Sequence, residues 1–167
     1  TATTEIYTLS LHDALPICHS KRVAQYATLI AKSLGWTKDE IQNIKSCAYL
    51  HDIGKIGIPD QILNKPGKLT QEEFNLIKQH TIIGQDIVKD ITIIPHLDEV
   101  TRSHHEHYDG TGYPDGLKGN EIPIQARIIT LADSYDAMNS KRIYRNALSF
   151  EQASSKLSFF VVMSIPA

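Results

Sequence analysis

The sequence is poor in cysteine and lacks any long apolar run. Its 167 residues include only two cysteines, Cys18 and Cys47, which cannot form a disulfide framework and so favour a reducing compartment. No apolar stretch approaches the ~20 residues of a membrane span, and no secretory signal is recognisable. The formal net charge of −2 leaves no basic excess for polymeric nucleic acid or an anionic membrane. These absences predict a cytoplasmic protein without a membrane segment.

Helical periodicity dominates what is present. Apolar residues recur at three- and four-residue steps, and no stretch alternates convincingly as a strand. Thr37 with Glu40, and Thr70 with Glu73, are capping-box pairs that mark two helix starts. The length suits one domain with a sizeable core. We therefore predict an all-α domain with helices at residues 19–34, 38–50, 70–80, 82–88, 97–105, 126–138 and 150–157. Residues 53–69 and the glycine-rich residues 108–119 are expected to be loops.

The first residues differ from the rest of the chain. All ten residues from Thr8 to Ile17 match the in-frame translation of a common short-read sequencing adapter. We therefore expect residues 1–18 to be a non-native, adapter-derived segment that is not part of the natural domain. The alternative is an ordinary N-terminal turn.

Candidate metal ligands gather around one dipeptide, His51-Asp52, at the end of an apolar helical run. Alone, adjacent His and Asp often only cap a helix end. A neutral imidazole and an ionised carboxylate, however, suit Zn, Fe, Mn or Ni, and one aspartate can bridge two metals. The chain supplies five further residues of these two types: His19, His80, His104, His105 and Asp133.

Two motifs carry a resemblance to a known family. They are HDIGKIGIPDQILNKPGKLT, from His51, and HHEHYDGTGYPDGLKG, from His104. With His19 before them and Asp133 after them, the chain resembles the HD superfamily of metal-dependent phosphohydrolases, in its HD-GYP subfamily. The resemblance covers residues 19–157 and leaves 158–167 as an irregular or truncated tail. It implies an HD-domain helical bundle with a Gly-rich loop at residues 108–119, the GYP loop.

The resemblance also implies a ligand set for two divalent transition metals, whose identity (Fe, Mn, Ni or Zn) the sequence does not decide. His19, His51, Asp52 and Asp133 would hold one metal. Asp52 would bridge to the second, which His80, His104 and His105 would complete. Some family members bind a third metal through a glutamate four residues before the first ligand histidine. Leu15 stands there in this chain, so we expect two metals.

The substrate implied by the resemblance is the bacterial second messenger cyclic di-GMP. A metal-bridging hydroxide would attack the phosphodiester and give linear pGpG, with GMP after a second cleavage. Asp52 and Lys55 would be the catalytic residues. Lys55, Arg142 and Arg145 would contact phosphate oxygens, and Tyr113 would line the guanine or ribose side of the pocket. The family more often has lysine at the position of Arg145, which keeps the charge.

Two other functions stay open from the sequence. One is an HD phosphohydrolase that acts on another nucleotide. The other is a non-catalytic module that senses a cyclic dinucleotide or binds a diguanylate cyclase. The family also leads us to expect an upstream receiver or sensor domain.

Two acidic residues near the ligands have open roles. Glu106 either orients an imidazole or is an exposed glutamate. Asp136 either supports a ligand or accepts a hydrogen bond from Arg142.

Overall fold

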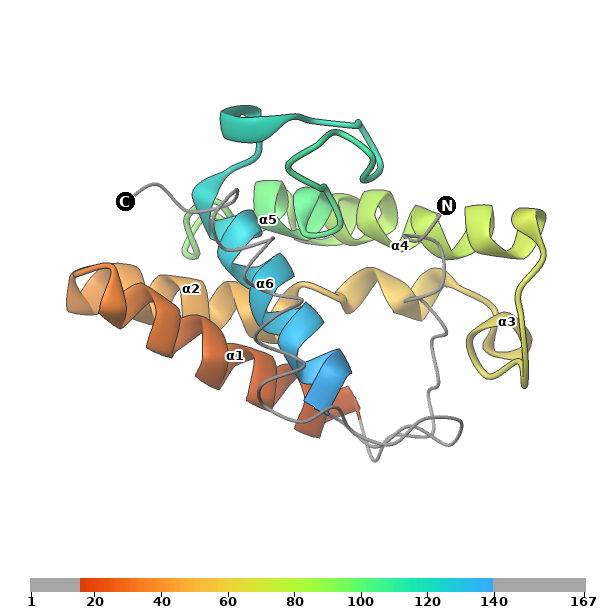
Figure 1. Ribbon diagram of the computed structural model, residues 1–167, viewed down its shortest axis with the longest axis horizontal. Coiled ribbons are helices and arrows are strands. Elements are labelled where there is room, and N and C mark those ends of the chain that lie inside the picture. The colour runs from red at the N-terminus through yellow and green to blue at the C-terminus, as the bar shows by residue number, and fades with distance from the viewer. Residues whose placement is uncertain (1–15, 140–167) are drawn as a thin grey trace.

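Every regular element of the described chain is a helix, which confirms the all-α prediction. The computed structural model describes residues 16–139 (Figure 1). Between these bounds no strand is present. The elements are α1 Pro16–Ser33, α2 Lys38–Leu50, η1 Ile53–Gly57, α3 Asp60–Leu63, α4 Gln71–Val88, α5 Leu97–Ser103, η2 Gly119–Glu121 and α6 Ile124–Asn139, where η marks a 3-10 helix.

Both predicted capping boxes form. The Thr37 hydroxyl accepts from the backbone N–H of Glu40 at 3.3 Å, and the Glu40 carboxylate accepts from the N–H of Thr37 at 2.8 Å. Thr70 and Glu73 repeat the arrangement with the same two distances. Each box satisfies N–H groups that the first turn of a helix leaves without partners. The starts of α2 and α4 are thus encoded locally.

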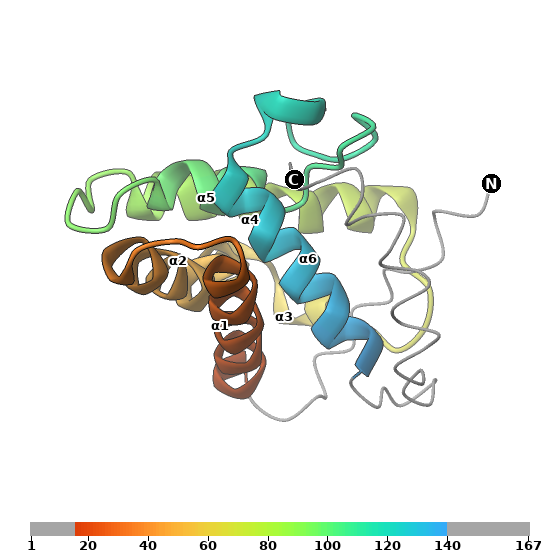
Figure 2. The same ribbon diagram turned by 60° about the vertical axis from the view of Figure 1, so that its left-hand side comes forward.

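The helices enclose one main core. α1 packs along α2, and α4 packs along η1 and α5 (Figure 1). α6 runs obliquely across the bundle and contacts both α1 and α5 (Figure 2). The fully buried members of this core include Val23, Ile44, Val100, Ile128 and Ile129. Because α6 touches elements from both halves of the chain, it fixes the position of Asp133 relative to the earlier histidines.

Two predictions about the middle of the chain were wrong. Gln71–Val88 form one helix, α4, instead of two short ones. Its interior Gly84 is buried against η1, where the backbone of Gly54 passes so closely that a Cβ on Gly54 would lie 1.9 Å from the His80 carbonyl oxygen. This helix contact compensates the low helix propensity of glycine. Residues 53–69 are also not only loop, because they include η1 and α3.

None of the helices between residues 16 and 139 combines the length and apolar character needed to cross a membrane. The expected helix at 150–157 lies outside the described residues. The division into a non-native segment 1–18, a domain 19–157 and a tail 158–167 stays a prediction.

Candidate metal centre

The His51-Asp52 dipeptide lies where α2 gives way to η1. His51 is the residue that ends α2, and its Nδ1 lies 2.7 Å from the carbonyl oxygen of Ala48, three residues earlier. An imidazole that donates its Nδ1–H to a carbonyl keeps the Nε2 lone pair for a metal. The end of a helix, where carbonyl groups lack backbone partners, thus selects the tautomer of His51.

Two other predicted ligands use the same device. His80 Nδ1 lies 2.6 Å from the Ile77 carbonyl oxygen, and His104 Nδ1 lies 2.9 Å from that of Thr101. Both side chains are fully buried. In all three histidines the carbonyl is three residues before the ring, so Nε2 points away from the helix that carries it. The three Nε2 atoms converge on Asp52.

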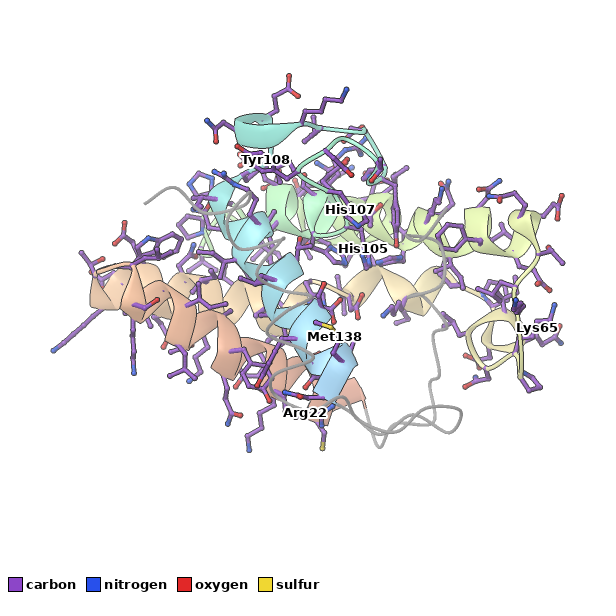
Figure 3. The ribbon with its side chains drawn as sticks, viewed as in Figure 1. Arg22, Lys65, His105, His107, Tyr108 and Met138 are labelled. Atoms are coloured by element: carbon purple, nitrogen blue, oxygen red, sulfur yellow. The ribbon has the colours of Figure 1, made fainter. Side chains whose placement is uncertain are left out.

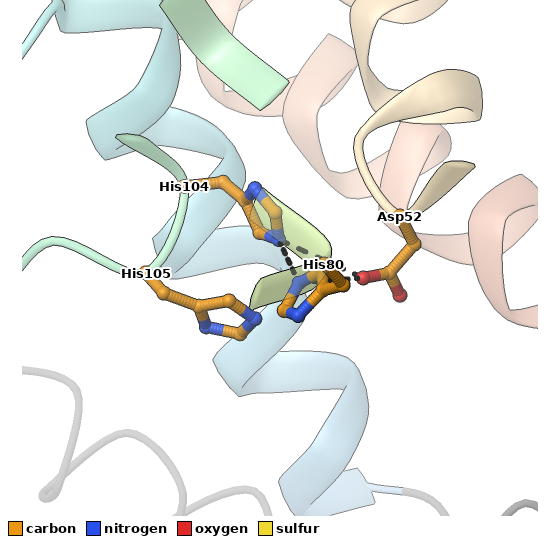
Figure 4. Close-up of side chains that lie close together, drawn as sticks. All are labelled: Asp52, His80, His104 and His105. Carbon is orange, nitrogen blue, oxygen red and sulfur yellow. Dashed lines mark hydrogen bonds and ion pairs between the residues drawn. The ribbon is translucent and has the colours of Figure 1, made fainter. Parts of the chain in front are cut away.

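The two carboxylate oxygens of Asp52 face different groups of ligands. Oδ1 lies 3.5 Å from His80 Nε2 and 3.6 Å from His104 Nε2, and these contacts are drawn in Figure 4. Oδ2 lies 3.4 Å from His51 Nε2 and 3.9 Å from His19 Nε2. One carboxylate is therefore shared between two groups of imidazoles, as a bridging ligand requires.

His19 is held from two sides. Its Nδ1 lies 2.8 Å from Asp136 Oδ2, and its Nε2 lies 3.2 Å from Asp133 Oδ1. Arg22, one turn further along α1, donates two hydrogen bonds to the carboxylate of Asp136. Asp136 thus supports a predicted ligand, as one of our two readings allowed, through a carboxylate–histidine pair.

Two overlapping clusters of ligand atoms result, each with all its ligand atoms within 4.8 Å of one another. The first cluster is His19, His51 and Asp52, with Asp133 beside His19. The second cluster is Asp52, His80, His104 and His105. All seven predicted ligands are therefore brought together. The Oδ1 atom of Asp52 is buried and has no hydrogen-bond partner within the described chain, which fits a carboxylate built to bind a cation.

The electrostatics of the two clusters differ. Burial lowers the pKa of His19, but hydrogen bonds with Asp133 and Asp136 outweigh this effect and raise it to about 9. Burial, with the charge of a neighbouring imidazole, lowers the pKa of His80 to about 3. Burial also lowers the pKa of His105 well below its usual range. The second cluster therefore presents neutral imidazoles, the form that binds metal.

The predicted substrate residues lie next to the clusters where they are described. Lys55 Nζ donates to Asp52 Oδ2 at 2.5 Å and keeps part of its side chain exposed. Burial raises the pKa of Asp52, but Lys55 and then His51 outweigh it and keep the pKa well below its usual range. Arg142 and Arg145 lie outside the described residues.

Tyr113, from the GYP loop, stacks on His105 with ring centroids 4.8 Å apart and planes at 24°. His105, labelled in Figure 3, also contacts the His80 and His104 rings, with centroids 5.0 Å and 4.2 Å apart. The loop thus covers the second cluster with an aromatic ring, next to where a ligand of the metals would bind.

Glu106 is buried, so the reading of an exposed glutamate was wrong. Its carboxylate accepts three backbone N–H groups of the GYP loop, from Asp115 at 2.7 Å, Gly116 at 3.1 Å and Leu117 at 3.1 Å. Sequence could not reveal this role because the partners are backbone groups nine to eleven residues away.

Replacing Glu106 by glutamine should destabilise the loop, since the amide nitrogen cannot accept a hydrogen bond. A buried N–H left without an acceptor costs about 1–3 kcal/mol of unfolding free energy, and these partly buried groups should cost about 1 kcal/mol, at the lower end of that range. Denaturant unfolding and hydrogen exchange of the amides at 115–117 measure the effect. The exposed Glu121, which accepts from Lys118 N–H, provides the control Glu121→Gln with little change. Wild-type stability and exchange in Glu106→Gln would contradict the assignment.

Comparison with known proteins identifies the family. The family model described as HD domain matches residues 4–159, a range that extends over the segment 8–17. A cyclic di-GMP phosphodiesterase of Thermotoga maritima is 48% identical over 137 residues, which are 81% of this chain and 37% of that protein. A 3'3'-cGAMP-specific phosphodiesterase 3 of Vibrio cholerae is 41% identical over 135 residues, or 81% of this chain and 29% of that protein. The chain thus spans about a third of the length of these relatives.

Structural similarity points the same way. Bd1817 from Bdellovibrio bacteriovorus, described as a HDG"Y"P protein, superposes with a TM-score of 0.72 at 26% identity, over 94% of this chain and 50% of that one. This match extends the likeness from sequence motifs to the helical bundle that carries the two clusters. The chain therefore belongs to the HD-domain family, and within it to the HD-GYP group.

Proposed function

We propose that this chain is the catalytic domain of a metal-dependent phosphodiesterase that hydrolyses cyclic di-GMP. The observation that carries the proposal is the shared carboxylate of Asp52, whose Oδ1 and Oδ2 face separate groups of imidazole nitrogens. A carboxylate in this position suits a pair of metals, and paired metals are the usual catalysts of phosphodiester hydrolysis near neutral pH.

The residues of the two clusters would hold the metals. The first cluster with Asp133 provides one set of ligands and the second cluster the other, joined at Asp52. Bound there, the metals would supply a nucleophile from water and neutralise charge on the phosphate. The mixed imidazole and carboxylate donors suit Fe, Mn, Ni or Zn.

The side chains of the protein orient the metal ligands and place positive charge near the phosphate site. Backbone carbonyls fix the tautomers of His51, His80 and His104, so their Nε2 atoms need no rearrangement before binding. Lys55 places an ammonium group at the edge of the first cluster, where it would contact a phosphate oxygen. Tyr113 would exclude water from one side of the substrate.

The substrate is proposed from the relatives, because one of them is a cyclic di-GMP phosphodiesterase at 48% identity. Arg142 and Arg145 would add phosphate contacts, and the products would be pGpG and, after a second cleavage, GMP. A cytoplasmic location fits the two free cysteines, Cys18 and Cys47. An upstream receiver or sensor domain and a diguanylate cyclase partner remain expectations of the family resemblance.

A second candidate is hydrolysis of another cyclic dinucleotide. This candidate is supported by the Vibrio cholerae relative at 41% identity, which is named a 3'3'-cGAMP-specific phosphodiesterase. A sensor without catalysis is less well supported, because all seven ligand residues are kept and lie together.

A substrate panel tests the proposal. We expect the purified chain, loaded with Mn or Fe, to release pGpG from cyclic di-GMP. The same preparation would be assayed with 3'3'-cGAMP, cyclic di-AMP and a generic phosphodiester such as bis(p-nitrophenyl) phosphate. Cleavage of the generic ester alone would contradict the assignment of a cyclic dinucleotide substrate, and cleavage of none would contradict catalysis.

A further inference from the structure

One cation beside the second cluster is engaged by aromatic rings instead of a carboxylate. Lys78 lies on α4, two residues before His80. Its Nζ is 4.7 Å from the centroid of the Phe74 ring and 5.4 Å from that of Tyr113. The Phe74 and Tyr113 rings themselves meet edge to face, 6.2 Å apart. The three side chains form a unit that we call the Lys78 subsite.

The Lys78 ammonium keeps hydrogen-bonding capacity for a ligand. Other described cations are paired with carboxylates: Lys55 with Asp52, Arg22 with Asp136 and Arg102 with Asp115. No ion pair or acceptor for Lys78 Nζ is found in residues 16–139. Ring faces attract an ammonium through their quadrupoles without neutralising it. Two rings can take up at most part of its three donors, so at least one N–H is directed elsewhere.

The position of the subsite matches the base of a nucleotide better than its phosphate. Tyr113 separates Lys78 from His105, with 5.4 Å from Nζ to the Tyr113 ring and 4.8 Å from that ring to His105. Lys78 thus lies one aromatic ring beyond the second cluster. Lys55 and, when bound, the metals would provide positive charge where the phosphate would bind, whereas the base extends away from it.

The chemistry of the donor then selects among bases. An ammonium group only donates hydrogen bonds. Guanine presents two neighbouring acceptors, O6 and N7, on its Hoogsteen edge, whereas adenine presents the N7 acceptor beside the N6 donor. A fixed ammonium would therefore bind guanine with two favourable contacts and meet a donor on adenine.

Resting on the proposed function, we propose that the Lys78 subsite binds a guanine base of the cyclic dinucleotide and sets the preference for guanine over adenine. Phe74 and Tyr113 hold the ammonium in place, and Lys78 donates to O6 and N7. Lys78 is here a specificity-determining residue, because it contacts the base and not the reacting phosphate.

The test compares kcat/KM for cyclic di-GMP and cyclic di-AMP in four proteins: wild type, Lys78→Met, Lys78→Arg and Lys89→Met. Lys78→Met keeps most of the apolar contact with the rings but removes the donors. We expect it to lower kcat/KM for cyclic di-GMP about tenfold, the value of a good base contact, and to change that for cyclic di-AMP less than about twofold. Lys78→Arg should keep the guanine preference, since arginine also matches O6 and N7. Lys89, exposed at the end of α4 and paired with Asp86, provides the control.

The possible results distinguish failure of the guanine assignment from failure of the proposed phosphodiesterase activity. An equal loss for both substrates would mean a phosphate contact and would overturn the inference, as would an unchanged ratio. The ratio of the two dissociation constants, measured by calorimetry with slowly hydrolysed phosphorothioate analogues of both dinucleotides on metal-loaded wild type and Lys78→Met, gives a readout without turnover. If no substrate is cleaved, the proposed function fails, and the ratio of dissociation constants alone decides the inference. Binding of neither dinucleotide overturns both.

Discussion

Alanine at position 52 is expected to reduce cyclic di-GMP cleavage by about a thousandfold or more. Asp52 is the residue common to both clusters, so its loss removes a ligand from each. Metals contribute several kcal/mol of transition-state stabilisation, and each 1.36 kcal/mol is a factor of about ten in rate. The measurement is the steady-state rate of pGpG release at saturating metal.

The Asp52→Ala chain should still fold, which separates lost chemistry from lost structure. The Oδ1 atom of Asp52 has no hydrogen-bond partner in the described part of the chain, and Lys55, its partner at Oδ2, can turn to solvent. We expect an unchanged far-UV circular dichroism spectrum. Asp86, whose side chain is 67% exposed, provides the control Asp86→Ala with wild-type activity. More than about a tenth of wild-type activity in Asp52→Ala would be inconsistent with metal catalysis at this site.

Among substitutions that add one methyl group to the described core, Gly54→Ala is expected to lower the free energy of unfolding the most. A Cβ there would lie 1.9 Å from the His80 carbonyl oxygen and 2.4 Å from the Gly84 backbone nitrogen. Backbone cannot move aside as a side chain can, so η1 and α4 must separate. Overpacking typically costs 1–3 kcal/mol and sometimes more, and a backbone clash on this scale should cost at least about 3 kcal/mol of unfolding free energy. Urea denaturation measures it.

Gly57→Ala is the matched control. It lies in the same short helix, but the nearest atoms to its Cβ would be two side-chain methyl carbons of Ile83, at 3.0 Å. The flexible Ile83 side chain can shift, so we expect a cost below about 1.5 kcal/mol. Equal stability of the two variants would mean that η1 does not pack against α4 as described. Because His80 and Asp52 sit on the two sides of this contact, Gly54→Ala should also weaken metal binding.

Sequence predicted the parts of the site that depend on local signals. The capping boxes at Thr37 and Thr70 mark helix starts because both partners lie within one turn. The ligand types were readable because imidazole and carboxylate groups recur in a recognisable order. Neither signal required knowledge of how the helices pack.

The features that sequence missed depend on packing between distant segments. α4 continues through Gly84 because the backbone of Gly54 and the methyl group of Thr101 pack against that glycine, and neither neighbour is local. Glu106 holds backbone groups of a loop whose conformation no short pattern determines. The sequence suggested that Asp136 supports a metal ligand, but it did not reveal the partner Arg22. That contact depends on the packing of α6 against α1.

Counting the bound metal ions decides whether Asp52 joins two metal sites. Inductively coupled plasma mass spectrometry would give the metal ions per chain in wild type, His19→Ala, His105→Ala and Asp52→Ala. The two clusters predict two ions in wild type, about one in each histidine variant, and close to none when the shared ligand is lost. If Asp52→Ala keeps the full wild-type content, or if wild type binds a single ion, Asp52 does not bridge two metals and the account is wrong.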